Sequence, residues 1–279
     1  MGYVVQVPPG KAAKLRNIPT DDAGELDHET ANAKFDELAA ELGELQELLY
    51  GAKTHALLIV LQGLDTSGKD GAIRGVFKDV SPEGCVVTQF KTPTEEDLGH
   101  DFLWRVHPHT PARGMIGVFN RSHYEDVLIV RVNKLAPPGV WRERFAQIND
   151  FERLLETNKT IIAKYYLHIS EREQKERLLA RERDVEKAWK LSAQDWIERR
   201  SWNAYWDAYD DALTKCNSDY APWRIVPADH KWFRNLAIAE DLVNLLRPYK
   251  KAWLETLSEQ GMRELAAIKK AREAGKISI

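Results

Sequence analysis

The sequence predicts an α/β protein built on a parallel, doubly wound sheet. Five short apolar runs rich in β-branched residues alternate with patterns typical of helices, and a glycine-bracketed loop follows the first run. Because consecutive parallel strands need a crossover helix, this alternation favours one parallel sheet with helices on both faces. The predicted strands are 56–61 and the runs that begin at Cys85, Met115, Thr160 and Trp223.

The chain is predicted to form a single domain, because 279 residues with 43% hydrophobic content can fill one large core. Residues 1–27 are rich in proline, glycine and charge, and they are expected to be either an arm laid over the domain or a loose tail. Leucines and Phe35 recur at spacings of three and four in 28–50, which predicts a helix. A helical lid is expected at about 171–192, and a last amphipathic helix at about 249–275 that Gly275 ends.

Composition limits the classes of function. The net charge of -3 arises from 40 basic and 43 acidic residues, so any anion site must be a local cluster. The two cysteines, Cys85 and Cys216, show no metal-ligand spacing, which favours reduced thiols in a cytoplasmic protein. No apolar run approaches the ~20 residues of a membrane span, so no membrane association is expected.

The loop after the first strand is predicted to bind phosphate. Gly63, Gly68 and Lys69 match the pattern G-x-x-x-x-G-K between a predicted strand and a predicted helix. Glycines let backbone N–H groups turn inward around an anion, the helix N-terminus adds its positive dipole end, and the lysine supplies a charge. Thr66 and Ser67 lie within this loop and are counted with the phosphate-binding residues.

Two acids accompany the loop. Asp70 stands where such loops usually carry the Ser or Thr that ligates Mg²⁺. Asp70 is interpreted either as an acid at the start of the helix, which is favoured, or as a group that binds Mg²⁺ through water. An acid within an anion-binding loop repels the anion unless it has a function there. Asp65 is therefore predicted to be a Mg²⁺ ligand or to orient the acceptor.

The segment "MIGVFNRSHYEDVL" forms the second constellation. Asn120 stands where the third strand usually ends in an acid that places the metal, and Arg121 follows it. An arginine at this edge of the sheet is well placed to clamp a phosphoryl group through two hydrogen bonds. Glu125 is counted with the nucleotide-binding residues, and either Glu125 or Asp126 is a candidate to share the metal with Asp65.

The segment "KERLLARERDVEKAWK" supplies a third, basic cluster. Arg177 and Arg181 lie four residues apart on one predicted helical face, and Lys187 and Lys190 follow. A basic face can be merely solvated, but many phosphotransferases carry an arginine-bearing lid between the fourth and fifth strands. The two arginines are therefore predicted to be catalytic, and the two lysines to bind phosphates.

Aromatic residues follow the basic cluster with helical spacing. They are predicted to pack into the core, which is the commonest role of such a face. Tryptophan-rich faces would also suit a dimer or tetramer, so a homo-oligomer is expected. The residues are Trp196, Trp202, Tyr205, Trp206 and Tyr209.

A long polyanion would need a cationic track. Basic residues that flank the third strand are expected to supply part of it, and metal binding by the two histidines among them is disfavoured because no third ligand is evident. These residues are Lys91, Arg105, His107, His109 and Arg113.

Four motifs in this order resemble the polyphosphate kinase 2 family. They are "GLDTSGKDG", "FNRSHYEDVL", the 177–190 segment with "KAWKLS", and "APWRIVPADHK". The similarity covers about 56–246. It implies a thymidylate-kinase-like P-loop fold, a three-layer sandwich with a helical lid, and Mg²⁺-dependent phosphoryl transfer between inorganic polyphosphate and nucleotides.

The resemblance also assigns roles by matching position. The family's loop aspartate falls on Asp65, its phosphate lysine on Lys69 and its post-strand pair on Asn120 and Arg121. The "HYED" motif resembles the subgroup that phosphorylates both AMP and ADP, so adenine nucleotides are the expected acceptors, with guanine left open. The lid departs from the family pattern at Arg183 and Val185, where an acid and a proline are common.

Two other functions compete with polyphosphate transfer. An ATP-dependent nucleoside or nucleotide kinase could use the same fold, but Asp70 replaces its metal-binding hydroxyl. A non-catalytic nucleotide- or polyanion-binding protein is the other alternative. Nucleic acid is not an expected partner, because no strand motif combines aromatic and basic residues for base stacking.

Overall fold

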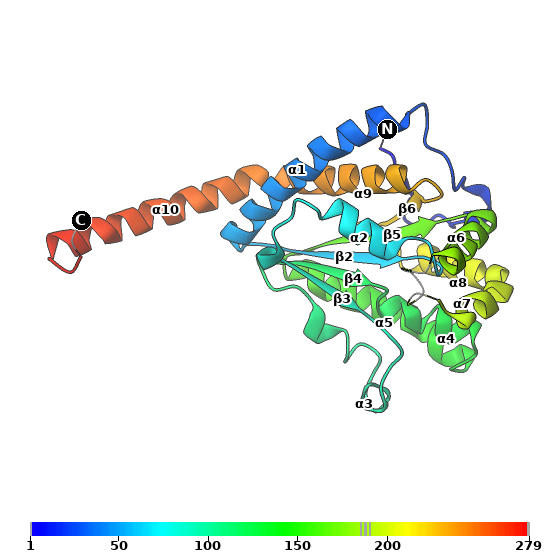
Figure 1. Ribbon diagram of the computed structural model, residues 1–279. Helices are drawn as coiled ribbons and strands as arrows, with labels where there is room; N and C mark the ends of the chain where they lie inside the picture. The colour runs from blue at the N-terminus through cyan, green and yellow to red at the C-terminus, as the bar shows by residue number, and fades with distance from the viewer. Residues whose placement is uncertain (1, 185, 187–188, 190, 278–279) are drawn as a thin grey trace.

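The computed structural model describes residues 2–184, 186, 189 and 191–277, and within them six strands form one sheet between layers of helices (Figure 1). All five predicted strands are present. The strands are β1 (Val5–Gln6), β2 (Ala56–Gln62), β3 (Cys85–Gln89), β4 (Ile116–Asn120), β5 (Thr160–His168) and β6 (Trp223–Pro227).

The strand order determines where the functional loops meet. It is β1-β6-β5-β2-β4-β3, and every pair except β1 with β6 is parallel. Every residue of the central strand β2 is buried, as expected of a strand covered on both faces. Leu61 of β2 pairs with Asn120 of β4, so the loop after β2 and the turn after β4 leave the same edge of the sheet side by side.

The expectation of a purely parallel, five-stranded sheet is wrong at one edge. β1 pairs antiparallel with β6, with Val5 opposite Ile225, so the sheet is mixed. A two-residue strand in a proline- and glycine-rich arm shows no alternation that sequence reasoning could detect. The arm is laid over the domain: Leu15 is fully buried, and its N–H donates to Asp210 Oδ1 at 2.8 Å.

Helices cover both faces of the sheet. In Figure 1, α1, α2 and α9 lie above it, whereas α4, α5 and α8 lie below. The α-helices are α1 (His28–Ala52), α2 (Lys69–Val76), α3 (Glu95–Leu98), α4 (Ile129–Val132), α5 (Pro138–Thr157), α6 (Glu171–Arg183), α7 (Ala193–Glu198), α8 (Trp202–Lys215), α9 (Lys231–Leu246) and α10 (Lys250–Glu273). Short 3-10 turns include η1 (Leu15–Asn17), η4 (His123–Asp126) and η6 (Arg199–Ser201).

Several predicted helix features are confirmed. The stripe in 28–50 forms α1, and Gly275 follows α10 with a φ of 67°, the left-handed conformation that glycine tolerates at a helix end. Of the aromatic residues predicted to pack inside, Trp202, Tyr205 and Tyr209 of α8 are buried, whereas Trp196 and Trp206 are only partly buried.

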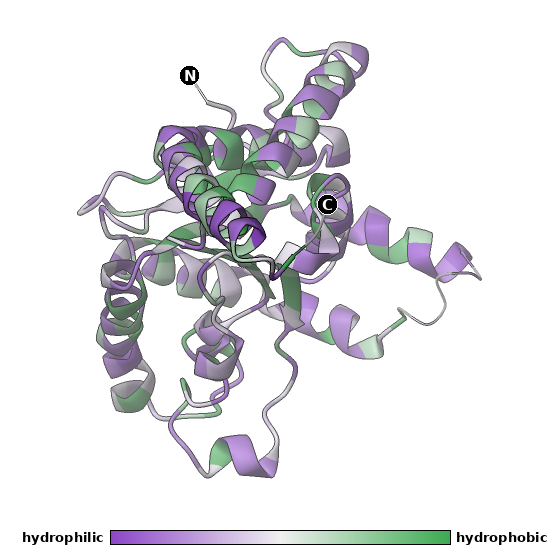
Figure 2. Ribbon diagram, turned by 90° about the vertical axis from the view of Figure 1, so that its left-hand side faces the viewer, coloured by the Kyte–Doolittle hydropathy of each residue, from purple (hydrophilic) through white to green (hydrophobic). Residues whose placement is uncertain are grey.

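The colouring by hydropathy reflects this layering. In Figure 2 the central strands are mostly green, whereas the surrounding helices carry much purple. Among the described residues, no helix has an apolar stretch long enough to span a lipid bilayer. Cys85 and Cys216 are both free thiols, as predicted.

Candidate functional site

The glycine loop between β2 and α2 has the backbone of an anion-binding turn. Gly63 has a φ of 152° and Gly68, which caps α2, has a φ of 101°, conformations that residues with a Cβ rarely adopt. A Cβ at Gly63 would lie 2.9 Å from the Leu167 carbonyl oxygen, so packing requires glycine there as well. The loop places the N-terminus of α2 at the carboxyl edge of the sheet, where its N–H groups can meet a phosphate.

Two buried hydroxyls in the loop have no hydrogen-bond partner among the described residues. They are Thr66 Oγ1 and Ser67 Oγ. Buried polar atoms are nearly always hydrogen-bonded in folded proteins, so a bound anion is a natural acceptor for these hydroxyls.

Lys69 folds back over this loop. Its Nζ donates to the carbonyl oxygens of Gly63 at 2.7 Å and Leu64 at 3.2 Å. Burial and, after it, the charge of Arg121 lower the pKa of Lys69 to about 8, although the charge of Asp65 acts in the opposite direction. The ammonium is thus poorly compensated, and an approaching phosphate would stabilise it.

A large cavity opens beside the loop. Its volume is about 370 Å³, and seven basic and three acidic side chains lie among its walls. The excess of positive charge is local, since the whole chain has a net charge of -3. The basic residues are Lys69, Arg74, Arg121, Arg177, Arg181, Lys231 and Arg234, and the acids are Asp65, Asp70 and Asp195.

Arg234 of α9 is a site residue that the sequence analysis missed. It is 3% exposed, and its Nε and Nη2 both donate to Asn235 Oδ1. Its Nη1 lies over the loop, where a Cβ at Gly68 would approach it to 2.1 Å. Among the residues that the structure describes, no carboxylate forms an ion pair with Arg234, so the cavity holds a buried cation without a counter-charge.

A signal for Arg234 is present in the sequence. "DHKWFR" begins directly after the last strand, at the edge where the loop lies, and Lys231 and Arg234 are three residues apart at the start of a helix. That spacing puts both on one helical face. The motif "APWRIVPADHK" ends three residues before Arg234.

Arg177 holds the loop in place rather than facing a substrate. Its Nη1 donates to the carbonyl oxygens of Thr66 and Ser67, each at 3.0 Å, and its Nη2 donates to those of Ala228 and Asp229. Its Nε donates to Glu173 Oε1 at 2.7 Å. All five N–H groups therefore have acceptors within the protein, and the position of Arg177 is that of a positioning residue instead of the predicted lid catalyst.

The remaining lid residues have different positions. Arg181 lines the cavity, and its Nη1 donates to Asp195 Oδ2 of α7 at 3.1 Å. Gln174 Nε2 donates to the Asp65 carbonyl oxygen at 3.0 Å, so the first part of the predicted lid is fixed to the loop. Lys187 and Lys190 lie outside the described residues, as does Val185.

The expected cationic track beside the third strand is not part of this cavity. None of its predicted residues is among the side chains that line the cavity. Instead, Arg105 Nη1 donates to the Lys91 carbonyl oxygen at 2.8 Å. The cavity is lined instead by basic residues of α2 and α9, because both helices begin near the loop; they are Arg74, Lys231 and Arg234.

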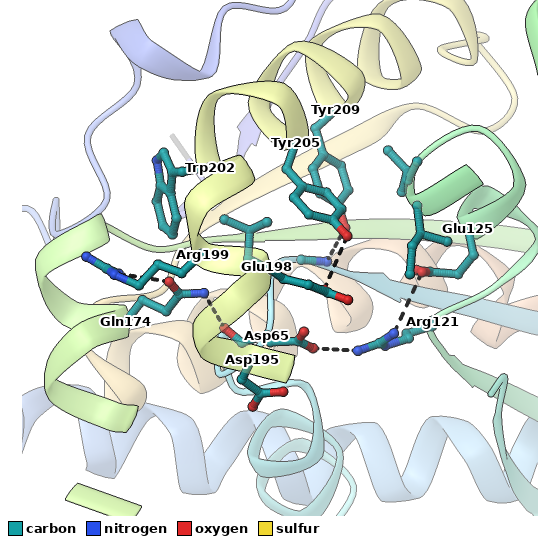
Figure 3. A pocket seen from close by; sticks show the side chains of 14 residues that line it. Asp65, Arg121, Glu125, Gln174, Asp195, Glu198, Arg199, Trp202, Tyr205 and Tyr209 are labelled. Carbon is teal, nitrogen blue, oxygen red and sulfur yellow. Dashed lines mark hydrogen bonds and ion pairs between the residues drawn. The ribbon is translucent and has the colours of Figure 1, made fainter. Parts of the chain in front are cut away.

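The turn after β4 brings Arg121 against the loop. Arg121 has a φ of 62°, an uncommon conformation for a residue with a side chain and one often found at functional sites. Its Nη2 lies 2.5 Å from Asp65 Oδ1, and its Nη1 lies 3.8 Å from Glu125 Oε2 (Figure 3). The guanidinium is thereby held between two acids with its position set before any ligand arrives.

The pKa values of the two acids that contact Arg121 are shifted in opposite directions. Burial opposes the ionisation of Asp65, but the charges of Arg121 and Lys69 outweigh it, so the pKa of Asp65 is below its ordinary value. Burial raises the pKa of Glu125 despite the same two cations. Such divergence within one cluster is typical of functional sites.

Some residues of the "HYED" motif lie at the site and others in the core. Glu125 faces Arg121, whereas Tyr124 is buried and its hydroxyl donates to Glu152 Oε1 at 2.7 Å. Asp126, a candidate metal ligand by sequence, does not line the cavity beside the loop and forms an ion pair with Arg144 at 2.9 Å. Burial raises the pKa of Asp126 to about 6. The structure therefore removes Asp126 from the candidate metal ligands.

A second, smaller cavity adjoins the first. Its volume is about 30 Å³, and it shares Asp65, Arg121 and Asp195 with the larger cavity. Figure 3 shows Glu198 beside Asp65, and burial followed by the charge of Asp65 raises the pKa of Glu198. Aromatic side chains from α8 close its other side; they are Trp202, Tyr205 and Tyr209.

The residues at the loop suit a metal that brings most of its own ligands. Within the described ranges, no three His, Cys, Asp or Glu side chains converge on a preformed metal site. Mg²⁺ in phosphotransferases keeps several waters and is bound by substrate phosphates and only one or two carboxylates. Asp70 Oδ1 accepts a hydrogen bond from Asn120 Nδ2 at 2.8 Å, so the two unusual residues of the motifs are partners on the cavity wall.

An α/β protein whose glycine loop opens into a basic cavity is equipped to bind a chain of phosphates. This chain belongs to the polyphosphate kinase 2 family, whose model matches residues 25–252. It is 43% identical over 243 residues to the AMP/ADP-polyphosphate phosphotransferase of Meiothermus ruber, covering 86% of this chain and 91% of that protein.

Two further relatives support this membership. The ADP-polyphosphate phosphotransferase of Rhodopseudomonas palustris is 43% identical over 227 residues, which cover 77% of this chain and 78% of that protein. The crystal structure of polyphosphate kinase 2 from Arthrobacter aurescens TC1 superimposes with a TM-score of 0.84 at 40% identity, covering 87% of each chain. The resemblance found in four motifs therefore extends over most of the chain.

Proposed function

We propose that this protein transfers the terminal phosphoryl group of inorganic polyphosphate to AMP and ADP, giving ADP and ATP, in a reversible reaction. The observation that carries the proposal is the basic cavity over the glycine loop, with the buried and uncompensated Arg234 in its wall. A relative with 43% identity is named an AMP/ADP-polyphosphate phosphotransferase. The fold that we infer for this reaction is the P-loop kinase fold of the thymidylate-kinase type.

The larger cavity is the proposed donor site. Polyphosphate carries about one negative charge on each phosphate, and a wall with seven basic side chains complements such a chain along its length. Arg74 in the last turn of α2 and Lys231 at the start of α9 line the same cavity, and Arg181 lies on the lid side. The proposed path of the donor runs between these helices and ends at Lys69.

The reacting phosphoryl group is placed at Arg121, because Arg121 lies where the two cavities meet. Its guanidinium can share two hydrogen bonds with the transferred group, and its ion pairs with Asp65 and Glu125 fix its orientation. Lys69 adds a second charge from the loop. Together they neutralise charge that develops on the equatorial phosphate oxygens, the main task in phosphoryl transfer.

The smaller cavity is the proposed entrance of the acceptor nucleotide. Its present volume of about 30 Å³ has room for about one water molecule. A nucleotide therefore requires α7 and the start of α8 to move away from Asp65. The ion pair between Arg181 and Asp195, which links α6 to α7, is the contact that must adjust.

Mg²⁺ is the proposed cofactor. Asp70 and Asp65, both in the wall of the donor cavity, are the carboxylates that would hold it, with Asn120 orienting Asp70. When bound, the metal neutralises part of the charge on the phosphates. We further infer that the protein is cytoplasmic, in keeping with its free cysteines. We also infer that it forms a homo-oligomer.

The test mixes purified protein with Mg²⁺, long-chain polyphosphate and either AMP or ADP, without ATP, and follows nucleotides by chromatography. ADP and ATP formed from AMP are the expected result. ATP formed from ADP alone would keep the polyphosphate donor and refute the broad acceptor range. If product forms only when ATP is the donor, the protein is an ATP-dependent nucleotide kinase and the proposal is refuted. Lys69→Ala is the inactive control.

A further inference from the structure

The C-terminal helix α10 leaves the body of the protein. It spans Lys250–Glu273, about 36 Å at 1.5 Å per residue, and Trp253 is its one buried side chain among the described residues. In Figure 1 most of α10 runs clear of the other elements. The family model ends at residue 252, so all but the first three residues of this helix lie beyond what the family model matches.

One side of α10 is apolar, and the described residues leave most of it uncovered. Met262 is 61% exposed and Leu265 is 59% exposed, and Leu254 and Ile268 are also exposed. Single exposed apolar residues are common, but a stripe of them on a projecting helix indicates an interaction surface. Leu257 belongs to the same stripe and is partly covered by α1.

The stripe has a symmetric spacing. Leu257 and Leu265 lie four residues before and after Gly261, and Leu254 and Ile268 lie seven residues before and after it. Spacings of four and seven keep all of these residues on one helical face. Nothing lies within 4 Å of where a Cβ of Gly261 would be, so a second helix can approach closely there.

Charged residues beside the stripe are arranged with a similar symmetry, about a centre one residue further along the helix. Glu255 and Lys269 lie seven residues before and after Met262, and Lys251 and Glu273 lie eleven residues before and after it. Each pair joins opposite charges across the centre of the helix. When a second copy of α10 runs antiparallel, Glu255 of one copy falls near Lys269 of the other, and Lys251 falls near Glu273.

We propose that α10 is a self-association surface, on which two copies of this chain pair antiparallel about a two-fold axis near Gly261. Leu254 of one copy then packs on Ile268 of the other, and Leu257 packs on Leu265. Such a contact is isologous, because the same residues serve both partners. The opposite charges at the flanks select this alignment.

Size-exclusion chromatography with light scattering tests the proposal on the full chain over a wide range of protein concentration. The wild type is expected as a dimer or an even-numbered oligomer, and Leu265→Asp is expected to halve its mass. Ala267→Asp, an exposed position on the other side of α10, is the matched control and should keep the wild-type mass. A monomeric wild type, or a Leu265→Asp variant with the wild-type mass, would overturn the proposal.

Charge reversal and cross-linking test the antiparallel alignment. Lys269→Glu should weaken association, and the double variant Glu255→Lys with Lys269→Glu should restore it. Under mild oxidation Gly261→Cys should form a disulfide-linked dimer and Ile268→Cys should not, because residue 268 faces residue 254 of the other copy. Efficient cross-linking of Ile268→Cys would instead show a parallel pair and refute this alignment.

None of these substitutions touches the proposed phosphate site. Phosphoryl transfer from polyphosphate to AMP should therefore continue in Leu265→Asp, with thermal unfolding of the body unchanged. Loss of the oligomer and loss of activity can thus be told apart, and failure of one proposal leaves the other standing.

Discussion

Replacing Arg234 by methionine should make the protein more stable and a poorer enzyme. Burial lowers the pKa of Arg234 to about 10, and the charge of Arg177 acts in the same direction. An unperturbed arginine has a pKa of at least about 12.5, and one pKa unit corresponds to about 1.4 kcal/mol. Keeping this cation buried therefore costs about 3 kcal/mol in the free protein.

Methionine has a similar length and no charge. The variant removes that cost but loses the hydrogen bonds to Asn235, so we expect a gain of about 1 to 3 kcal/mol in the free energy of unfolding. In a protein of this size, each kcal/mol raises the unfolding temperature by about 2 to 4 °C. A hydrogen bond from arginine to phosphate contributes about 1.5 to 3 kcal/mol, so the KM for polyphosphate should rise about 10- to 100-fold.

The assay has two parts. Thermal unfolding by circular dichroism without ligand measures stability, and ADP formation from AMP at varied polyphosphate concentration measures KM. Lys231→Met is the matched control, since Lys231 lines the same cavity but is exposed; it should raise KM modestly and leave the unfolding temperature unchanged. A lower unfolding temperature with an unchanged KM would show that Arg234 is structural and refute the reasoning.

Three more outcomes are expected. Arg121→Ala should lower kcat by roughly 10³-fold or more with the circular dichroism spectrum unchanged. Asp126→Asn should keep most activity, because the Asp126 carboxylate pairs with Arg144 outside the site. Equal losses of activity in the two variants would contradict the different roles assigned to these residues. Because the pKa of Lys69 is about 8, its ammonium is charged below that pH and neutral above it, so the KM for polyphosphate should rise by at most about tenfold per pH unit above pH 8. Lys69→Arg should flatten this rise, and an identical pH profile would assign it elsewhere. Gly68→Ala should lower kcat/KM at least about tenfold and cost about 1 to 3 kcal/mol of stability, since φ is 101° there and Arg234 must move; wild-type kinetics and unfolding would exclude that requirement.

Features that depend on neighbouring residues could be predicted from the sequence. The five parallel strands, the helix over 28–50 and the glycine loop between the first strand and its helix each follow from a local spacing of apolar residues or glycines, and the structure contains all of them. The edge strand β1 could not be predicted in this way. Its two residues become a strand because β6 offers an unpaired edge, which is a tertiary circumstance.

The roles of individual arginines were decided by the tertiary structure. The sequence analysis chose Arg177 for its place in a basic helical segment, but its hydrogen bonds go to carbonyls about 50 and 110 residues away. Arg234 was missed because its burial beside Gly68, 166 residues earlier in the chain, depends on how α9 packs on α2. The local sequence pattern thus identified the loop and its lysine. The partner of each charged side chain was instead set by contacts between distant segments. These contacts determine whether a cation finds its acceptors within the protein or remains available to a ligand.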